Sequence, residues 1–146
     1  MSNYVANTFK RMCLKGDIIA LTDTFQIILM QAGFVFDRAS HHAYADVVGN
    51  ELATAFGYTA TGITLSGVAL TVDNTLNLAK LAWNNVQWDA SGGSLVAAGA
   101  IIYDDTTATP GHDFTDAIVA WIDANGTIIA SDGTPMFIQN INVELI

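Results

Sequence analysis

The chain has 146 residues, which is enough for one domain with its own hydrophobic core. Its 14 acidic residues outnumber the 5 basic ones, and the net charge of −9 argues against nucleic acid and anionic membranes as partners. Only 13% of the residues are charged, while 51% are hydrophobic. We therefore expect part of the apolar surface to contact another protein, the alternative being a neutral surface of Thr, Ser, Asn and Gly.

The N-terminal residues carry most of the positive charge. Lys10, Arg11 and Lys15 supply three of the five basic side chains and precede every carboxylate of the chain. This asymmetry predicts a short N-terminal arm over residues 1–15, joined to a single domain over residues 16–146. We expect Lys10, Arg11 and Lys15 to be candidate contacts with an acidic partner surface. The alternative is a solvated and partly frayed terminus.

The single cysteine, Cys13, cannot form a disulfide within the chain. It lies between Met12 and Leu14, a setting that favours a buried thiol over a reactive one. The longest apolar runs of the chain are too short to cross a bilayer. We therefore expect neither a disulfide framework nor a membrane partner.

Apolar residues alternate with polar ones through most of the chain, with the period of two that indicates β-strands. Residues 24–30 are more uniformly apolar and predict a strand that is covered on both faces. The parity of the apolar positions changes after Lys80, which predicts a β-bulge. One segment, 42–56, has helical character, with an irregular connection as the alternative. In the first half of the chain the predicted strands are 17–31, 61–72 and 75–88.

The second half of the chain repeats the pattern of short strands and turns. Asn125 and Gly126 stand between two apolar runs, which is the strongest short-range signal for a β-hairpin. Regularly spaced short strands are typical of sandwiches and barrels. We predict an all-β, antiparallel β-sandwich or jelly-roll-like domain with at most one short helix. Its remaining strands are predicted at 95–104, 116–123, 126–131 and 135–145.

No pattern in the sequence predicts a catalytic centre or a cofactor site. His41, His42 and Asp46 do not share one helical face, so we expect packing or capping roles for them rather than a zinc site. The acidic residues of the 104–116 loop fit no EF-hand spacing. They leave two interpretations open, a loose calcium site or ordinary Asp turn chemistry. We expect a protein without enzymatic activity.

The large aromatic residues have two interpretations. Aromatic side chains on strands are commonly core or interface anchors, but an exposed row of them can also bind sugars. We expect at least two of the three tryptophans to lie in the core. The residues concerned are Trp83, Trp88, Trp121, Tyr58 and Tyr103.

Several blocks of the sequence have a recognisable pattern, the most specific being Gly-Ala-Ile-Ile-Tyr-Asp-Asp-Thr at residues 99–106 within the wider block 88–105. The other blocks are Phe-Val-Phe-Asp at 34–37, His41, Tyr-Ala-Asp-Val at 44–47, Asn-Glu-Leu at 50–52, Gly-Tyr-Thr at 57–59, Thr-Leu-Ser-Gly at 64–67, Val-Asp-Asn-Thr at 72–75 and Trp-Ile-Asp at 121–123. Together they resemble small virion proteins of tailed bacteriophages over roughly residues 14–145. The 106–116 loop is longer than the turn that the resemblance implies there.

The resemblance implies a structural component of a tailed-phage virion, assembled in the cytoplasm of a bacterial host. The expected role is a capsid decoration or accessory protein that binds the head lattice, with the major capsid protein as partner and many copies or a homo-oligomer as its state. A tail, neck or fibre-associated module, acting as adaptor or receptor binder, is the alternative, and a carbohydrate-binding module is the third. The resemblance transfers no catalytic, cofactor or metal-binding residue.

Overall fold

A five-stranded antiparallel sheet forms the centre of the computed structural model, which describes residues 1–106 and 112–146. Its strand order is β1–β8–β7–β2–β3. Val, Ile, Leu and Ala dominate the three inner strands, and this composition suits a pleated surface that is buried on both sides. The strands are β1 (Ser2–Val5), β2 (Phe25–Met30), β3 (Ile63–Thr64), β7 (Leu95–Asp104) and β8 (Ile118–Ala130).

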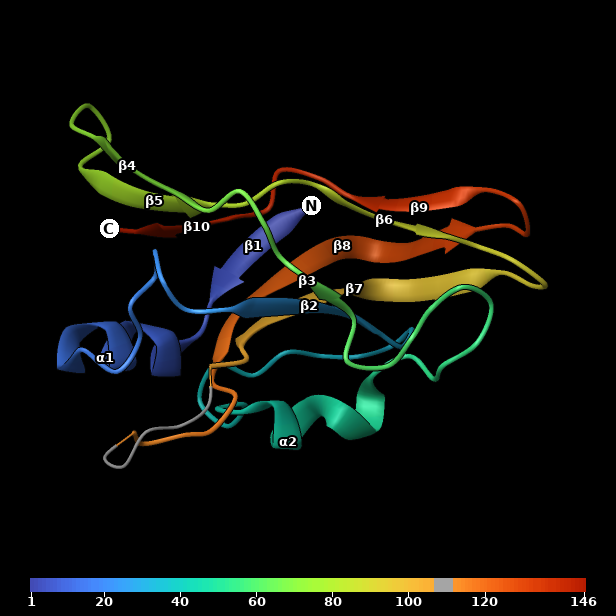
Figure 1. Ribbon diagram of the computed structural model, residues 1–146, viewed down its shortest axis with the longest axis horizontal. Coiled ribbons are helices and arrows are strands. Elements are labelled where there is room, and N and C mark those ends of the chain that lie inside the picture. The colour runs from blue at the N-terminus through green and yellow to red at the C-terminus, as the bar shows by residue number, and fades with distance from the viewer. Residues whose placement is uncertain (107–111) are drawn as a thin grey trace.

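A second layer lies across one face of this sheet (Figure 1). It is a long antiparallel ribbon in which β5 pairs with β10 and β6 pairs with β9, and β4 extends it beside β5. The ring of Trp83, at the middle of the ribbon, packs edge-on against Phe25 of β2 at 5.2 Å. The predicted all-β, sandwich-like fold is therefore confirmed. The strands of this layer are β4 (Ala69–Asp73), β5 (Leu78–Ala82), β6 (Val86–Asp89), β9 (Pro135–Ile138) and β10 (Asn142–Leu145).

Short helices and connections cover the opposite face of the central sheet, where Figure 1 places α2. Tyr44 of α2 stacks on Tyr103 of β7 at 4.8 Å, and Phe34 meets Trp121 of β8 at 5.1 Å. β2 is consequently buried on both faces except at Gln26, as predicted for residues 24–30. The described residues contain two short α-helices, where the sequence predicted at most one. The helical elements are α1 (Asn7–Lys15), α2 (Tyr44–Val47) and the 3-10 helix η1 (Val48–Asn50). Only α2 and η1 lie in the segment 42–56, where one longer helix was expected.

The predicted hairpin at Asn125 and Gly126 is wrong. β8 runs continuously through both residues, because β7 is long enough to pair with both of its halves. The pairing shifts register between Ala97 and Gly99, so that residues 124–127 bulge out of the ladder. The positive φ angles of Asn125 (57°) and Gly126 (146°) fit the local turn signal, but the chain does not reverse there.

Residues 1–15, predicted as an arm separate from the domain, lie within its architecture. β1 is the edge strand of the central sheet and pairs with β8 from Ser2–Asp123 to Val5–Ala120. The helix α1 then buries Phe9 and Met12 against the core and ends at Gly16, whose φ of 84° fits a left-handed cap. The apolar spacing of α1, rather than its charge, sets its position.

Several predicted strands are shorter than expected, because neighbouring backbone groups find other partners. Of the 17–31 segment only β2 is a strand. The 75–88 segment is interrupted at residues 83–85, so the predicted bulge appears as a break between β5 and β6 after Ala82. In the facing strand, residues 139–141 interrupt the ribbon at the same level, where the Trp83 N–H donates to the carbonyl of Ile141 at 3.0 Å. No helix among the described residues is long and apolar enough to cross a membrane.

Candidate functional site: an apolar end of the molecule

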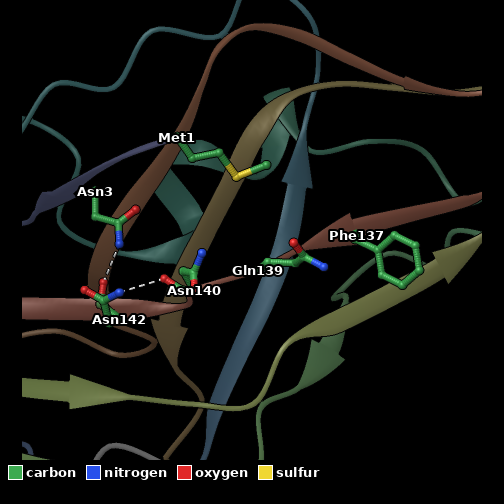
Figure 2. Close-up of a pocket in the computed structure, with 6 residues that line it drawn as sticks. All are labelled: Met1, Asn3, Phe137, Gln139, Asn140 and Asn142. Atoms are coloured by element: carbon green, nitrogen blue, oxygen red, sulfur yellow. Dashed lines mark hydrogen bonds between the residues drawn. The ribbon is translucent and has the colours of Figure 1, made fainter.

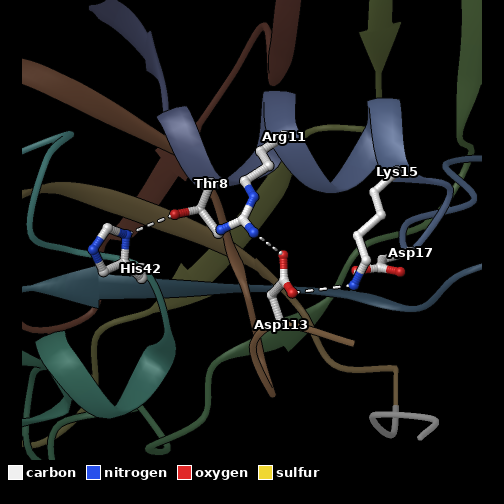
Figure 3. A network of polar contacts seen from close by, with 6 residues as sticks. All are labelled: Thr8, Arg11, Lys15, Asp17, His42 and Asp113. Carbon is white, nitrogen blue, oxygen red and sulfur yellow. Dashed lines mark hydrogen bonds and ion pairs between the residues drawn. The ribbon is translucent and has the colours of Figure 1, made fainter. Parts of the chain in front are cut away.

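The predicted partner contacts Lys10, Arg11 and Lys15 lie on α1, and two of them pair within the chain (Figure 3). Arg11 reaches Asp113 at 3.0 Å, while Lys15 reaches Asp17 at 3.0 Å and Asp113 at 3.1 Å. These carboxylates raise the pKa of Lys15, Asp17 contributing most. Lys10 is exposed and forms no ion pair with any residue that the structure describes.

The histidine pair has packing and hydrogen-bonding roles. The Nδ1 atom of His42 lies 2.8 Å from the hydroxyl of Thr8, and His41 stacks on Phe34. Asp46 accepts the backbone N–H groups of His42 and Ala43 at 2.9 and 3.0 Å. Within residues 1–106 and 112–146, no three His, Cys, Asp or Glu side chains gather where they could hold a metal ion.

The acidic 104–116 loop is only partly described, since residues 107–111 lie outside the described residues. Asp104 is buried, and its Oδ1 accepts the backbone N–H of Thr106 at 2.8 Å. Burial, together with a smaller contribution from the nearby Asp23 carboxylate, raises the pKa of Asp104 to about 6. Burial also raises the pKa of the Cys13 thiol to about 11, which leaves a poor nucleophile at neutral pH.

The five aromatic residues considered for sugar binding are buried and form no exposed platform. All three tryptophans are buried, which confirms the prediction that at least two belong to the core. Tyr58 and Tyr44 donate their hydroxyls to the buried carboxylate of Glu51, Tyr58 at 2.6 Å. The Thr61 N–H also donates to Glu51, at 2.7 Å, so that this carboxylate joins three separate segments below the sheet. Its role is to hold the layer that covers the sheet.

A hollow of about 310 Å³ lies where β1, β9 and β10 meet (Figure 2). Its polar lining is bonded within itself, since Asn3 donates to the carbonyl of Asn142 at 2.8 Å and Asn142 donates to that of Asn140 at 2.7 Å. Met1, Phe137 and Gln139 complete the lining, and no lining side chain carries a charge.

One end of the molecule collects exposed apolar side chains. Figure 1 shows α1 and the β4–β5 hairpin at the same, left-hand end. Leu14 on α1 is 92% exposed, and Val72 on β4 is 70% exposed. A contiguous exposed apolar surface marks an interaction site, whereas single exposed apolar residues are ordinary. We call α1, the segment that follows it and the β4–β5 hairpin together the apolar end; the large exposed apolar residues on them, six of the fourteen among the described residues, are Leu14, Ile19, Leu21, Leu70, Val72 and Leu76.

The apolar end also carries most of the positive charge. Lys10, Arg11 and Lys15 lie on α1, and Lys80 lies on β5, so four of the five basic residues are on these elements. Carboxylates accompany them, since Asp113 pairs with Arg11 and Lys15, Asp17 pairs with Lys15, and Glu144 lies 3.9 Å from Lys80. The charges at this end are therefore largely balanced within the molecule. Apolar groups with balanced charge are suited to contact a protein surface.

The sequence predicted the chemistry of this surface but not its residues. The contact with another protein that scarce charge predicts stays a prediction, and α1 contributes the basic residues that were singled out. Leu70 and Val72 were missed, because they alternate with polar residues as core positions do. Their exposure depends on β4 lying at the edge of the second layer, which only the sheet order reveals.

Comparisons with known protein families, with characterised proteins and with solved structures found no match for this chain.

Proposed function

We propose that this protein is a non-enzymatic structural subunit that binds a protein assembly through its apolar end. The apolar end carries the proposal: exposed leucine, isoleucine and valine side chains lie on α1, on the segment after it and on the β4–β5 hairpin, at one end of a strongly acidic chain. Burial of these side chains against a partner stabilises the complex by about 25 cal/mol for each Å² of apolar surface removed from water.

The specific form of the proposal is a capsid decoration or accessory protein on the head of a tailed phage. Its support is the resemblance of blocks such as 99–106 to small virion proteins, which is a family analogy and so weaker support than a located site. A repeated lattice suits a small docking surface, because many weak contacts add up to strong overall binding. The acidic remainder keeps the molecule soluble before assembly.

A tail, neck or fibre-associated role uses the same kind of surface, and it differs in the number and arrangement of copies. The carbohydrate-binding alternative loses its main support, because the five aromatic residues that suggested it are buried. The five are Trp83, Trp88, Trp121, Tyr58 and Tyr103.

The test is rebinding of purified protein to particles produced without it. Val72→Glu and Leu14→Glu place a charge in the apolar end and are expected to weaken rebinding at least tenfold. Ile129→Glu is the matched control, because Ile129 is 66% exposed on strand β8, outside the apolar end. Circular dichroism and melting curves check that all three variants keep the wild-type fold.

Saturable rebinding at many symmetric positions supports the decoration role, and rebinding at a single vertex or along the tail moves the protein to the alternative role. Equal rebinding of the Val72→Glu, Leu14→Glu and Ile129→Glu variants contradicts docking through the apolar end. Failure of the wild-type protein to bind any particle contradicts the proposed function as a whole.

A further inference from the structure

The β4–β5–β10 sheet has one apolar face, of which one part is covered and one part is not. Directly opposite residues of antiparallel strands lie on the same face. The pairs Leu70–Leu81 and Leu81–Val143 therefore form one row across the three strands. Leu81 and Val143 are buried in the core, but Leu70 is 51% exposed. The row that begins inside the protein continues into solvent at β4.

The next row repeats this arrangement. Val72 lies opposite Ala79, and Ala79 lies opposite Leu145, which packs partly against the core. The exposed side of β4 is thus the outer margin of an apolar face. β5 lies beside one edge of β4, and no described strand lies beside the other edge. A further strand beside β4 would cover that margin.

The outer edge of β4 is free to pair. β4 ends its sheet, and among the described strands none lies beyond it. Proteins usually protect such edges with Pro, Lys, bulges or very short strands. Other strand ends here show such devices, since β3 has two residues and β9 begins with Pro135. β4 has five residues without Pro or Lys, and its only charge, Asp73, stands at its end.

The sequence of β4 is complementary to itself. When two antiparallel copies are centred on Thr71, Leu70 of each copy lies opposite Val72 of the other. Asp73 then lies opposite Ala69, so the two carboxylates do not face each other. The apolar row becomes continuous across both molecules, with Leu81 and Leu70 of one copy beside Val72 and Ala79 of the other.

Charge also favours this meeting point. The chain carries −9, so two copies repel each other over most of their surfaces. The β4–β5–β10 sheet contains two carboxylates, Asp73 and Glu144, and one ammonium, Lys80, which lies 3.9 Å from Glu144, so its net charge is only −1. Two such sheets can therefore approach with little repulsion.

We propose that β4 pairs antiparallel with β4 of a second copy of this chain, joining two three-stranded sheets into one continuous six-stranded sheet. This pairing rests on the proposed function. It assigns β4 to a contact with a second copy of the chain, while α1 contacts the other proteins of the assembly. Five residue pairs bury less than the roughly 1,600 Å² of a standard interface. The pairing is therefore weak in solution and becomes strong where a lattice holds the copies together.

Cysteine cross-linking tests both the pairing and its register. In a Cys13→Ala background, Thr71→Cys places two thiols across the two-fold axis, where paired Cα atoms are about 4.5–5.5 Å apart and a disulfide can form. We expect this variant to form covalent dimers under mild oxidation at least tenfold faster than Ile129→Cys, an exposed strand position outside the interface.

The register predicts a second result. Ala69→Cys or Asp73→Cys alone should not cross-link, because the two equivalent positions are about 13 Å apart at 3.3 Å per residue. An equal mixture of the two variants should form the heterodimer. Cross-linking of Thr71→Cys no faster than Ile129→Cys overturns the self-pairing, and the proposed function stands if the wild-type protein still rebinds to particles. Rapid cross-linking without rebinding keeps the self-pairing and removes the proposed function.

Discussion

The strand pair β7–β8 and the hairpin β4–β5 contain the same kinds of residues in opposite environments. β7 and β8 are rich in Ala, Ile and Val and lie between two covering layers, so that both faces of their central part are buried. β4 contains Leu and Val in alternation with Thr, but only β5 lies beside it and its side chains are exposed or partly exposed. The comparison shows that position in the sheet, rather than hydrophobicity, decides which apolar residues remain available for a partner.

The largest expected contrast comes from removing one large side chain in each region. Trp121 of β8 is buried against Phe34, and Trp121→Ala should lower the free energy of unfolding by about 3–5 kcal/mol. Leu70→Ala in β4 should lower it by less than about 1 kcal/mol, because Leu70 is half exposed. Urea unfolding followed by tryptophan fluorescence and circular dichroism measures both. Similar losses in the two variants would mean that the hairpin is part of the core.

Asp104 should make the central region sensitive to pH. Its pKa of about 6 lies above the unfolded value, so the native state binds this proton more tightly than the unfolded chain does. The stability contributed by the protonated form is complete below about pH 4 and is lost as pH rises through about 6. We expect the wild-type free energy of unfolding to fall by about 1–3 kcal/mol from pH 4 to pH 7, relative to Asp104→Asn. Parallel pH profiles of the two proteins would contradict this.

Gly99 tests how tightly β7 and β8 are joined. Its φ is 152°, and an added Cβ would come within 2.1 Å of the Ile122 carbonyl oxygen and 2.7 Å of the Trp121 ring. Gly99→Ala should therefore lower the free energy of unfolding by about 1–3 kcal/mol. Gly126 is the matched control, since its φ of 146° is similar but its added Cβ would meet nothing within 4 Å. The difference in unfolding free energy between the two alanine variants measures the steric cost of the added Cβ at residue 99. Equal losses would contradict this prediction and show that the backbone around Gly99 shifts to make room for the Cβ.

The smallest effect on stability is expected at the apolar end itself. Val72→Lys should change the free energy of unfolding by less than about 0.5 kcal/mol, because the side chain is largely in water. The same change protects the strand edge and should reduce self-association in sedimentation velocity. Loss of the folded state in this variant would show that β4 supports the core.

The sequence predicted the fold better than the connections. Residues 95–104 were predicted as a strand and match β7, because a Gly-rich turn and an acidic turn bound an apolar run of strand length. Asn125 and Gly126 gave a wrong hairpin prediction. Their local preference for a turn is satisfied by a bulge, because β7 pairs with β8 both before and after these two residues. Residues 1–15 were predicted as a separate arm from their charge alone. The prediction did not take into account Phe9 and Met12, which are buried and hold α1 on the core.

The candidate site was predictable in kind only. A composition poor in charge indicates that apolar side chains will be exposed, but local pattern cannot distinguish an inner strand from an edge strand. Arg11 and Lys15 illustrate the same limit, because their ion pairs with Asp113 join residues about a hundred positions apart. Contacts between residues far apart in the sequence therefore determine both the exposure of β4 and the ion pairs of α1.

A cryo-EM map of a particle that carries this protein would test directly whether it docks through the apolar end. We predict that α1 and β4 face neighbouring protein subunits, while the end formed by β6 and β9 faces solvent. A map in which the protein attaches through β6 and β9, with Leu14 and Val72 left in water, would contradict it.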